Sequence, residues 1–343
     1  MLRKVSAALC ATAVIALAGF NGANAQDTKM TFGITAPVED NGFSYTPFEV
    51  LVREIEGRSA GSIDVDFFPG GQLGNVESTI NATMDGVMQA SSAADGAITS
   101  IFPELQVLSI PYIFAGREVA WDVLDGPFGQ KLSDLMAEKT GLRPLGWYEN
   151  GGYRHYSSAK KELKTVEDLA GLKMRTMSHP MHMQIAKSLG MSPTPVPWGE
   201  LYISLQSGVV DGQENAIPTF LVPKLEEVQK NMILDGHVYA TTTVVVNEGW
   251  YQSLSEEQRA ILKQATDIAV GTSRGLSVSG ELIGRTYLEK SGVKVNDVSA
   301  TEKAKFRDKA QGPAIEWLRG QIDGALIDDL LAEVAKSEAK FGY

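Results

Sequence analysis

The chain has 343 residues, of which 43% are hydrophobic and 21% are charged. Its 42 acidic residues outnumber 31 basic ones, and the net charge of −11 argues against binding to nucleic acid or to anionic lipid. The single cysteine, Cys10, lies near the N-terminus, so the chain after it can form no disulfide and carry out no thiol chemistry. The length is sufficient for two domains.

The first 25 residues have the three parts of a secretory signal peptide. Residues 3–4 are basic, residues 5–20 are mostly apolar, and Ala-Asn-Ala at 23–25 fits a small-residue cleavage site. We therefore expect cleavage after Ala25 and localisation in the bacterial periplasm. No later stretch reaches about 18 consecutive apolar residues, so the mature chain is expected not to span a membrane.

The region before residue 90 alternates between strand and helix patterns. Hydrophobic side chains at every second position predict strands within residues 28–36 and 62–71. Residues 47–61 and 75–89 instead carry apolar side chains three and four positions apart, as amphipathic helices do. This β-α-β-α order predicts an α/β sheet with crossover helices.

The same alternation continues after an irregular middle region. Two helices split at Gly126-Pro127 are predicted over residues 117–142, followed by a strand-like stretch that Gly151-Gly152 interrupts. Two glycines loosen the backbone, which suits a crossing between domains. Further elements are strands near 171–177, 209–217 and 239–250, helices near 180–190 and 198–208, and a long helix that begins with a Ser255/Gln258 capping box and runs to about Gly292.

Arg175 lies inside one of these short strands. A lone arginine in a strand is usually exposed to solvent. A guanidinium is also well suited to bind a carboxylate or phosphate, because its planar fork donates parallel hydrogen bonds. The local pattern leaves both interpretations open.

Two other motifs suggest different functions. His179 and His182, with neighbouring methionines, could bind copper, although Pro180 separates them and no cysteine or acidic ligand is near. Residues 271–275 match the G-x-S-x-G motif of hydrolases. That motif needs a histidine later in the chain, and all four histidines precede Ser273, so a hydrolase is disfavoured.

Five segments carry the most specific motifs. They are residues 67–78, 108–114, 168–176, 190–215 and 226–239, and the run E-x-Y-x-x-L-Q-x-G-V-V-D-G-Q-E-N ends at Asn215. Through these segments the chain resembles the DctP-type solute-binding proteins of TRAP (tripartite ATP-independent periplasmic) transporters. The resemblance covers nearly all of the mature chain.

The resemblance implies two α/β domains with a ligand cleft between them, joined by crossing strands and a long hinge-spanning helix. The implied first domain comprises residues 27–151 plus 241–280, and the second comprises residues 152–240 plus 281–343. The implied function is capture of a small organic acid, such as a C4-dicarboxylate, a 2-oxo or hydroxy acid or a sugar acid. Delivery to TRAP membrane permease subunits would follow, without enzymatic activity, cofactor or metal.

The resemblance also implies roles for individual residues. Arg175 would bind the ligand carboxylate, Asn215 would hydrogen-bond it, and Trp198 would pack on the apolar part of the ligand. Arg154 is a second arginine of the family, in contact with the ligand or just behind it. Glu214 and His237 would form a polar network with Arg154. Thr35 and Asp95 are candidates from the first domain, with Glu39, Phe43 and Tyr45 as further ones.

Overall fold

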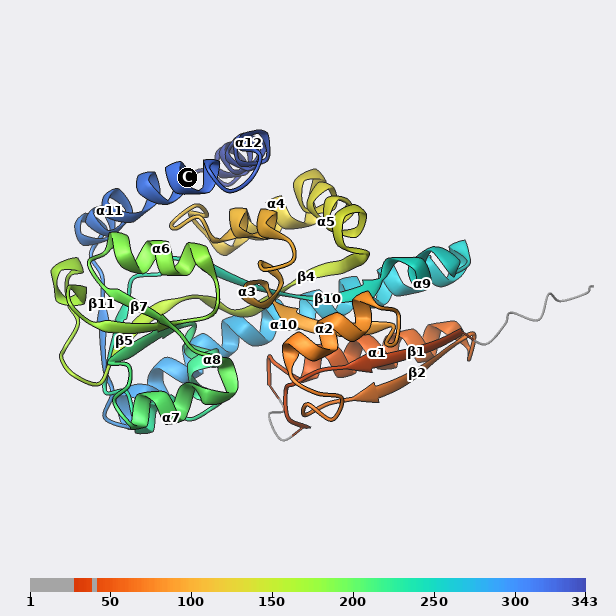
Figure 1. Cartoon of the computed structure of the whole chain (residues 1–343), viewed down its shortest axis with the longest axis horizontal. Coiled ribbons are helices and arrows are strands. Elements are labelled where there is room, and N and C mark those ends of the chain that lie inside the picture. Colours follow the sequence, from red (N-terminus) through yellow and green to blue (C-terminus); the bar gives the residue numbers. More distant parts are fainter. Residues whose placement is uncertain (1–27, 39–41) are drawn as a thin grey trace, which may run out of the picture.

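The computed structural model describes residues 28–38 and 42–343. The predicted signal peptide and Glu39 lie outside the described residues. The rest is a mixed α/β structure with two separate sheets, which confirms the predicted fold class (Figure 1).

The first sheet has the strand order β2-β1-β3-β10-β4. Strands β1, β2 and β3 are parallel, and β10 is antiparallel to both β3 and β4. Helices α1 and α10 pack on one face around Phe32 and Tyr148. The bounds are β1 Thr28–Gly33, β2 Ile63–Phe68, β3 Ala90–Ala94, β4 Leu142–Tyr153, β10 Tyr239–Asn247, α1 Thr46–Ser59 and α10 Glu256–Lys290.

The second sheet has the strand order β11-β9-β5-β8-β6-β7. Strand β6 pairs in parallel with both β7 and β8, so it is an interior strand, and its last three residues, 174–176, are buried. Helix α6 covers one face, and α7 and α8 lie on the other. The bounds are β5 His155–Ser158, β6 Lys173–Thr176, β7 Ser192–Pro195, β8 Gly212–Asn215, β9 Asn231–Leu234, β11 Lys294–Asp297, α6 Pro180–Ser188, α7 Leu201–Gln206 and α8 Ile217–Leu221.

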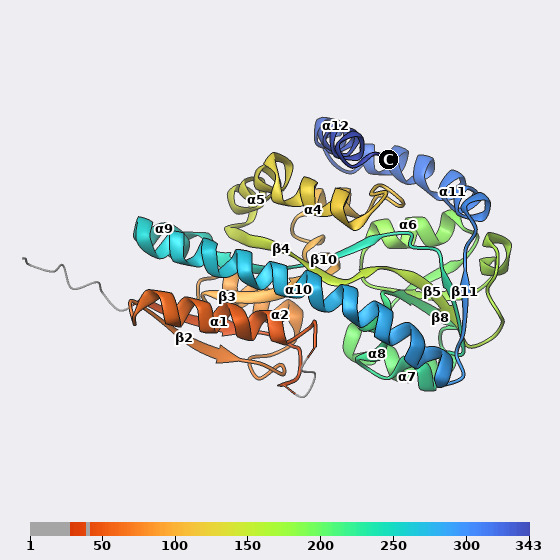
Figure 2. The ribbon, with the colours of Figure 1, turned by 180° about the vertical axis from the view of Figure 1, so that it is seen from behind.

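Three segments connect the sheets. The chain passes from β4 to β5 next to the predicted glycine pair, where Gly151 and Gly152 have φ of 81° and 102°, and it returns from β9 to β10. Helix α10 runs along the back of both sheets (Figure 2). Its N-terminus has the predicted capping box, formed by Ser255 and Gln258.

The C-terminal helices contact helices of both sheets. Helix α11 packs on α6, whereas α12 packs on α4 and α5. The domain boundaries stay a prediction. Among the described residues, no helix combines the length and apolarity needed to cross a membrane. The remaining bounds are α2 Val76–Met84, α3 Asp95–Ile98, α4 Arg117–Asp125, α5 Pro127–Thr140, α9 Glu248–Ser253, α11 Ala300–Arg319, α12 Gly324–Phe341 and the 3₁₀ turns η2 Pro103–Ser109, η3 Val166–Leu169, η4 Trp198–Glu200 and η5 Leu225–Glu227.

Helix α8 approaches α10 closely at a glycine of the long helix. A Cβ atom added at Gly284 would lie 2.7 Å from Ile217 Cγ2 and 3.0 Å from Leu221 Cδ1. The same atom added at Gly271, also in α10, would meet nothing within 4 Å. The packing of α8 on α10 therefore depends on the missing side chain at Gly284.

Replacing Gly284 by valine is expected to destabilise the protein, because the new methyl groups overlap with α8. Overpacking typically costs about 1–3 kcal/mol. Gly271→Val is the matched control, since valine there meets open space and has a higher helix propensity than glycine. Chemical denaturation should show a lower free energy of unfolding for Gly284→Val alone, and equal stability of the two variants would contradict this packing role.

Candidate functional site

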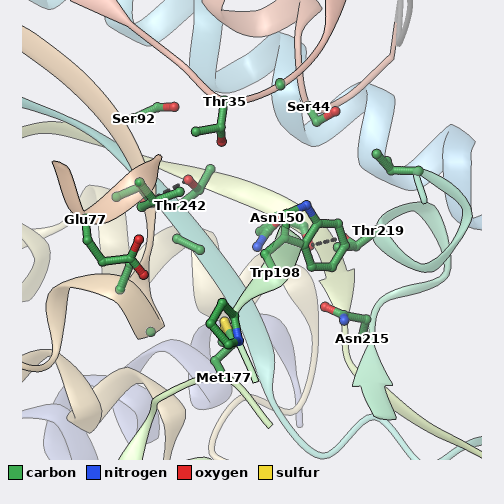
Figure 3. Close-up of a pocket in the computed structure, with 18 of the residues that line it drawn as sticks. Thr35, Ser44, Glu77, Ser92, Asn150, Met177, Trp198, Asn215, Thr219 and Thr242 are labelled. Atoms are coloured by element: carbon green, nitrogen blue, oxygen red, sulfur yellow. Dashed lines mark hydrogen bonds between the residues drawn. The ribbon is translucent and has the colours of Figure 1, made fainter. Parts of the chain in front are cut away.

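A cavity of about 210 Å³ lies between the two sheets. Several of its lining residues lie at or just after the carboxyl ends of strands, where open α/β sheets bind ligands. Figure 3 shows these side chains arranged around the cavity. The first sheet and the loops after its strands contribute Thr35, Ser92, Glu149 and Asn150, and the second contributes Arg175 and Asn215.

Arg175 is the only cationic side chain in the described lining, and it is 1% exposed. Side chains alternate along β6, so Met174 packs in the core and Arg175 points to the opposite face. Its Nε and Nη2 donate to the carbonyl of Val196 at 3.0 and 2.8 Å. Its Nη1 is buried without a hydrogen-bond partner. Because Arg175 is buried, it is not the solvent-exposed strand residue that the sequence pattern also allowed.

Glu214 does not neutralise Arg175, because Arg154 already binds it. Nε and Nη2 of Arg154 both donate to the Glu214 carboxylate. His182 Nδ1 and His237 Nε2 lie 3.2 and 3.4 Å from the same carboxylate. All of these side chains are buried. The oxygens of Glu214 are therefore engaged, and no described carboxylate forms an ion pair with Arg175.

Burial and charge act together on these groups. Burial lowers the pKa of the Arg175 guanidinium to about 10, Glu214 opposes the shift, and the charge of Arg154 adds to it. Burial raises the pKa of Glu214, but Arg154 and His182 outweigh it and hold that pKa well below its usual value. Arg175 thus keeps a buried positive charge for which the described residues supply no anion. Such a charge is costly unless it is paired.

Three more predicted site residues line the same cavity. Asn215 lies on β8, next to β6, and donates one amide hydrogen to Gln213 Oε1 at 2.7 Å. Its second amide hydrogen and its carbonyl oxygen remain for other partners. Trp198 is 39% exposed beside the cavity, and Thr35 follows β1. Phe43 also lines the cavity, whereas Tyr45 packs in the core.

The other predicted residues lie behind this lining. Arg154 is engaged by Glu214, as described above. His237 Nδ1 lies 2.8 Å from Asp235; burial lowers the pKa of His237, but Asp235 and Glu214 raise it by more. Asp95 is buried, accepts a hydrogen bond from the Gly96 amide at 2.6 Å, and has a pKa that burial raises. Direct contact of Arg154 or Asp95 with a ligand stays a prediction.

Several lining residues were not among the sequence candidates. They are Glu77 in the first turn of α2, Ser92 on β3, Asn150 on β4, Thr219 on α8 and Thr242 on β10. Glu77 lies inside the resembling segment 67–78, which was the one available signal. The other four residues come together at the cavity only because the two sheets face each other across it.

The His179–His182 segment lends no support to copper binding. The two imidazole rings stack with centroids 4.2 Å apart, and Ser109 Oγ lies 3.0 and 3.3 Å from their Nε2 atoms. Met181 is buried in the core. Within residues 28–38 and 42–343, no group of three or more His, Cys, Asp or Glu side chains is placed to hold a metal.

His179 is expected to make stability depend on pH. Burial, with the nearby His182, holds its pKa well below the ordinary value of 6.5, and its Nδ1 is buried without a partner. Below about pH 6.5 the unfolded chain binds a proton that the folded protein does not, so the free energy of unfolding falls by up to about 1.4 kcal/mol per pH unit. This stability is present at neutral pH and is lost as the pH falls.

His179→Gln is the control, because glutamine keeps a polar group near Ser109 and does not titrate. Urea unfolding at pH 7, 6 and 5 should show a steeper loss for the native protein than for the variant. Parallel pH dependence of the two proteins would show that His179 does not contribute.

Comparison with known proteins places the chain in a family. Residues 32–316 match the model for bacterial extracellular solute-binding protein, family 7, named DctP. The 2,3-diketo-L-gulonate-binding periplasmic protein YiaO of Escherichia coli K12 is 30% identical over 268 residues, which are 78% of this chain and 79% of YiaO.

Two crystal structures are also similar. The sugar acid binding protein DctPAm from Advenella mimigardefordensis, in complex with galactonate, is 30% identical with a TM-score of 0.84, covering 91% of this chain and 99% of that one. A TRAP periplasmic solute binding protein from Polaromonas sp. JS666, bound to D-erythronate, is 31% identical with a TM-score of 0.82, covering 89% and 98%.

These matches confirm the resemblance carried by the sequence motifs. The DctP family is periplasmic, and its members are binding proteins rather than enzymes. The chain belongs to the DctP family of TRAP-transporter solute-binding proteins, family 7 of the bacterial extracellular solute-binding proteins.

Proposed function

We propose that this protein captures a small organic acid in the periplasm and delivers it to the membrane subunits of a TRAP transporter. The observation that carries the proposal is the state of Arg175. Its guanidinium is buried, lines the cavity and leaves Nη1 without a partner. No carboxylate of the described residues forms an ion pair with Arg175, and a ligand carboxylate would supply this partner.

The free edge of the guanidinium has the geometry for such a ligand. Val196 occupies Nε and one hydrogen of Nη2, so both hydrogens of Nη1 and one of Nη2 remain. A carboxylate can accept from Nη1 and Nη2 together, and charge-assisted bonds of this kind are the strong ones. Asn215 would donate its free amide hydrogen to the same carboxylate or to a neighbouring oxygen.

The relatives support this ligand class. YiaO is named for 2,3-diketo-L-gulonate, and the two similar structures contain galactonate and D-erythronate. All three are small organic acids. Membership in a TRAP family supports delivery to membrane subunits, and the sequence pattern of residues 1–25 supports export with cleavage after Ala25.

Replacing Arg175 by methionine is expected to weaken acid binding strongly without lowering the stability of the ligand-free protein. Loss of the charge partner should weaken binding of D-erythronate or galactonate by about 2–5 kcal/mol. The ligand-free variant should unfold at the same or a higher temperature, because a buried, unpaired charge has been removed. Thermal unfolding with and without each acid measures both effects.

Arg154→Met is the matched control. It leaves Glu214 without its guanidinium, which should cost about 3–5 kcal/mol of stability with or without ligand. The capture role would be contradicted if Arg175→Met kept the acid-induced rise in melting temperature. It would also be contradicted if neither acid raised the melting temperature of the native protein.

Trp198 provides a second readout of binding. It is the most exposed of the five tryptophans, and it lines the cavity. A ligand that packs on it removes water from the indole, so tryptophan emission should shift to shorter wavelength when acid is added. Trp198→Phe should retain binding in calorimetry but lose the shift. An unchanged shift in that variant would place the ligand elsewhere.

A further inference from the structure

The charges around the cavity are few and unevenly placed. The described lining contains one cation, Arg175, and two carboxylates, Glu77 and Glu149. The protein neutralises the carboxylate of Glu149 but not that of Glu77. This difference affects which acid the site accepts. The inference rests on the proposed carboxylate capture by Arg175.

Glu149 is not available to a ligand. It is 0% exposed and its carboxylate forms an ion pair with Arg117, whose Nε lies 2.7 Å from Oε1. Trp121 Nε1 and the Tyr239 hydroxyl donate to its Oε2, each at 3.1 Å. Both oxygens therefore have partners, and the charge is balanced locally.

Glu77 is in the opposite situation. It lies in the first turn of α2, is exposed toward the cavity, and pairs with no cation among the described residues. Figure 3 shows its carboxylate and Asn215 on opposite sides of the cavity. Asn215 lies on the strand next to that of Arg175. The cavity thus has an unpaired cation in the part of its wall formed by the second sheet and an unpaired carboxylate in the part formed by α2.

The remaining polar lining is neutral and consists of hydroxyl and amide groups. Ser92, Asn150 and Ser178 line the cavity, and the buried Oγ of Ser44 has no hydrogen-bond partner. Hydroxyls and amides both donate and accept, so they match the hydroxyl groups of a polyol. A second carboxylate on the ligand would instead meet Glu77 with no cation to offset the repulsion.

We infer that the ligand is a polyhydroxylated monocarboxylate, and that Glu77 selects it by accepting hydrogen bonds from its distal hydroxyls and repelling a second carboxylate. Arg175 holds the carboxylate, and the hydroxyl chain extends toward Glu77. A dicarboxylate of the same length is the disfavoured ligand.

Two pairs of acids test this inference, because each pair differs only at the terminal carbon. They are galactonate with galactarate, and D-erythronate with meso-tartrate. Calorimetry of the native protein should show that the monoacid of the better-fitting pair binds at least tenfold more tightly than its diacid. Glu77→Gln keeps the size and removes the charge, so it should reduce this ratio several-fold. Glu77→Asp should retain the preference.

The outcomes separate this inference from the function on which it rests. The selectivity would be overturned if the monoacid and the diacid of a pair both bind in an Arg175-dependent manner with an affinity ratio near one. It would also be overturned if Glu77→Gln leaves that ratio unchanged. Either result would leave the carboxylate capture standing. Failure of all four acids to bind would overturn both. Tighter binding of 6-aminohexanoate than of either monoacid would show that Glu77 recognises an ammonium group, which also overturns the inference.

Discussion

The ion pair between Arg154 and Glu214 is the constraint on which the site depends. It engages Glu214, the carboxylate whose charge acts on Arg175, and it is held in place by His182 and His237. Among the described residues, the only hydrogen-bond acceptor of Arg175 in the cavity wall is the backbone carbonyl of Val196. A protein that only needed stability would gain from pairing this charge, and on this ground we propose that Arg175 serves to bind an anionic ligand.

The two-sheet architecture places the cavity between surfaces of different character. The second sheet supplies the cation and Asn215, whereas the first sheet and α2 supply hydroxyl groups and Glu77. The sheets are joined by the β4–β5 and β9–β10 crossings and by α10, whose close contact with α8 depends on Gly284. Binding of a ligand that contacts both surfaces therefore depends on the relative position of the two sheets as well as on the chemistry of the ligand.

Much of this arrangement follows from local sequence patterns, and the rest does not. Alternating hydrophobicity predicts β1 and β2, and the capping box predicts the start of α10. Strand β3 has the sequence Ala-Ser-Ser-Ala-Ala, which carries no hydrophobic alternation and becomes a strand through its neighbours. Arg175 and Asn215 were found through family motifs. The network of Glu214 and His237 with Arg154 was likewise predicted through the family resemblance, and the structure shows it. The exposure of Glu77 toward the cavity depends on long-range packing that no local pattern encodes.

The most direct test of the central claim is a crystal structure of the protein with the acid that gives the largest rise in melting temperature. We predict that the two carboxylate oxygens lie about 2.7–2.9 Å from Nη1 and Nη2 of Arg175. We also predict that Arg154 remains bound to Glu214. A ligand carboxylate bound to any other cation, with Nη1 of Arg175 still unpartnered, would contradict carboxylate capture by Arg175.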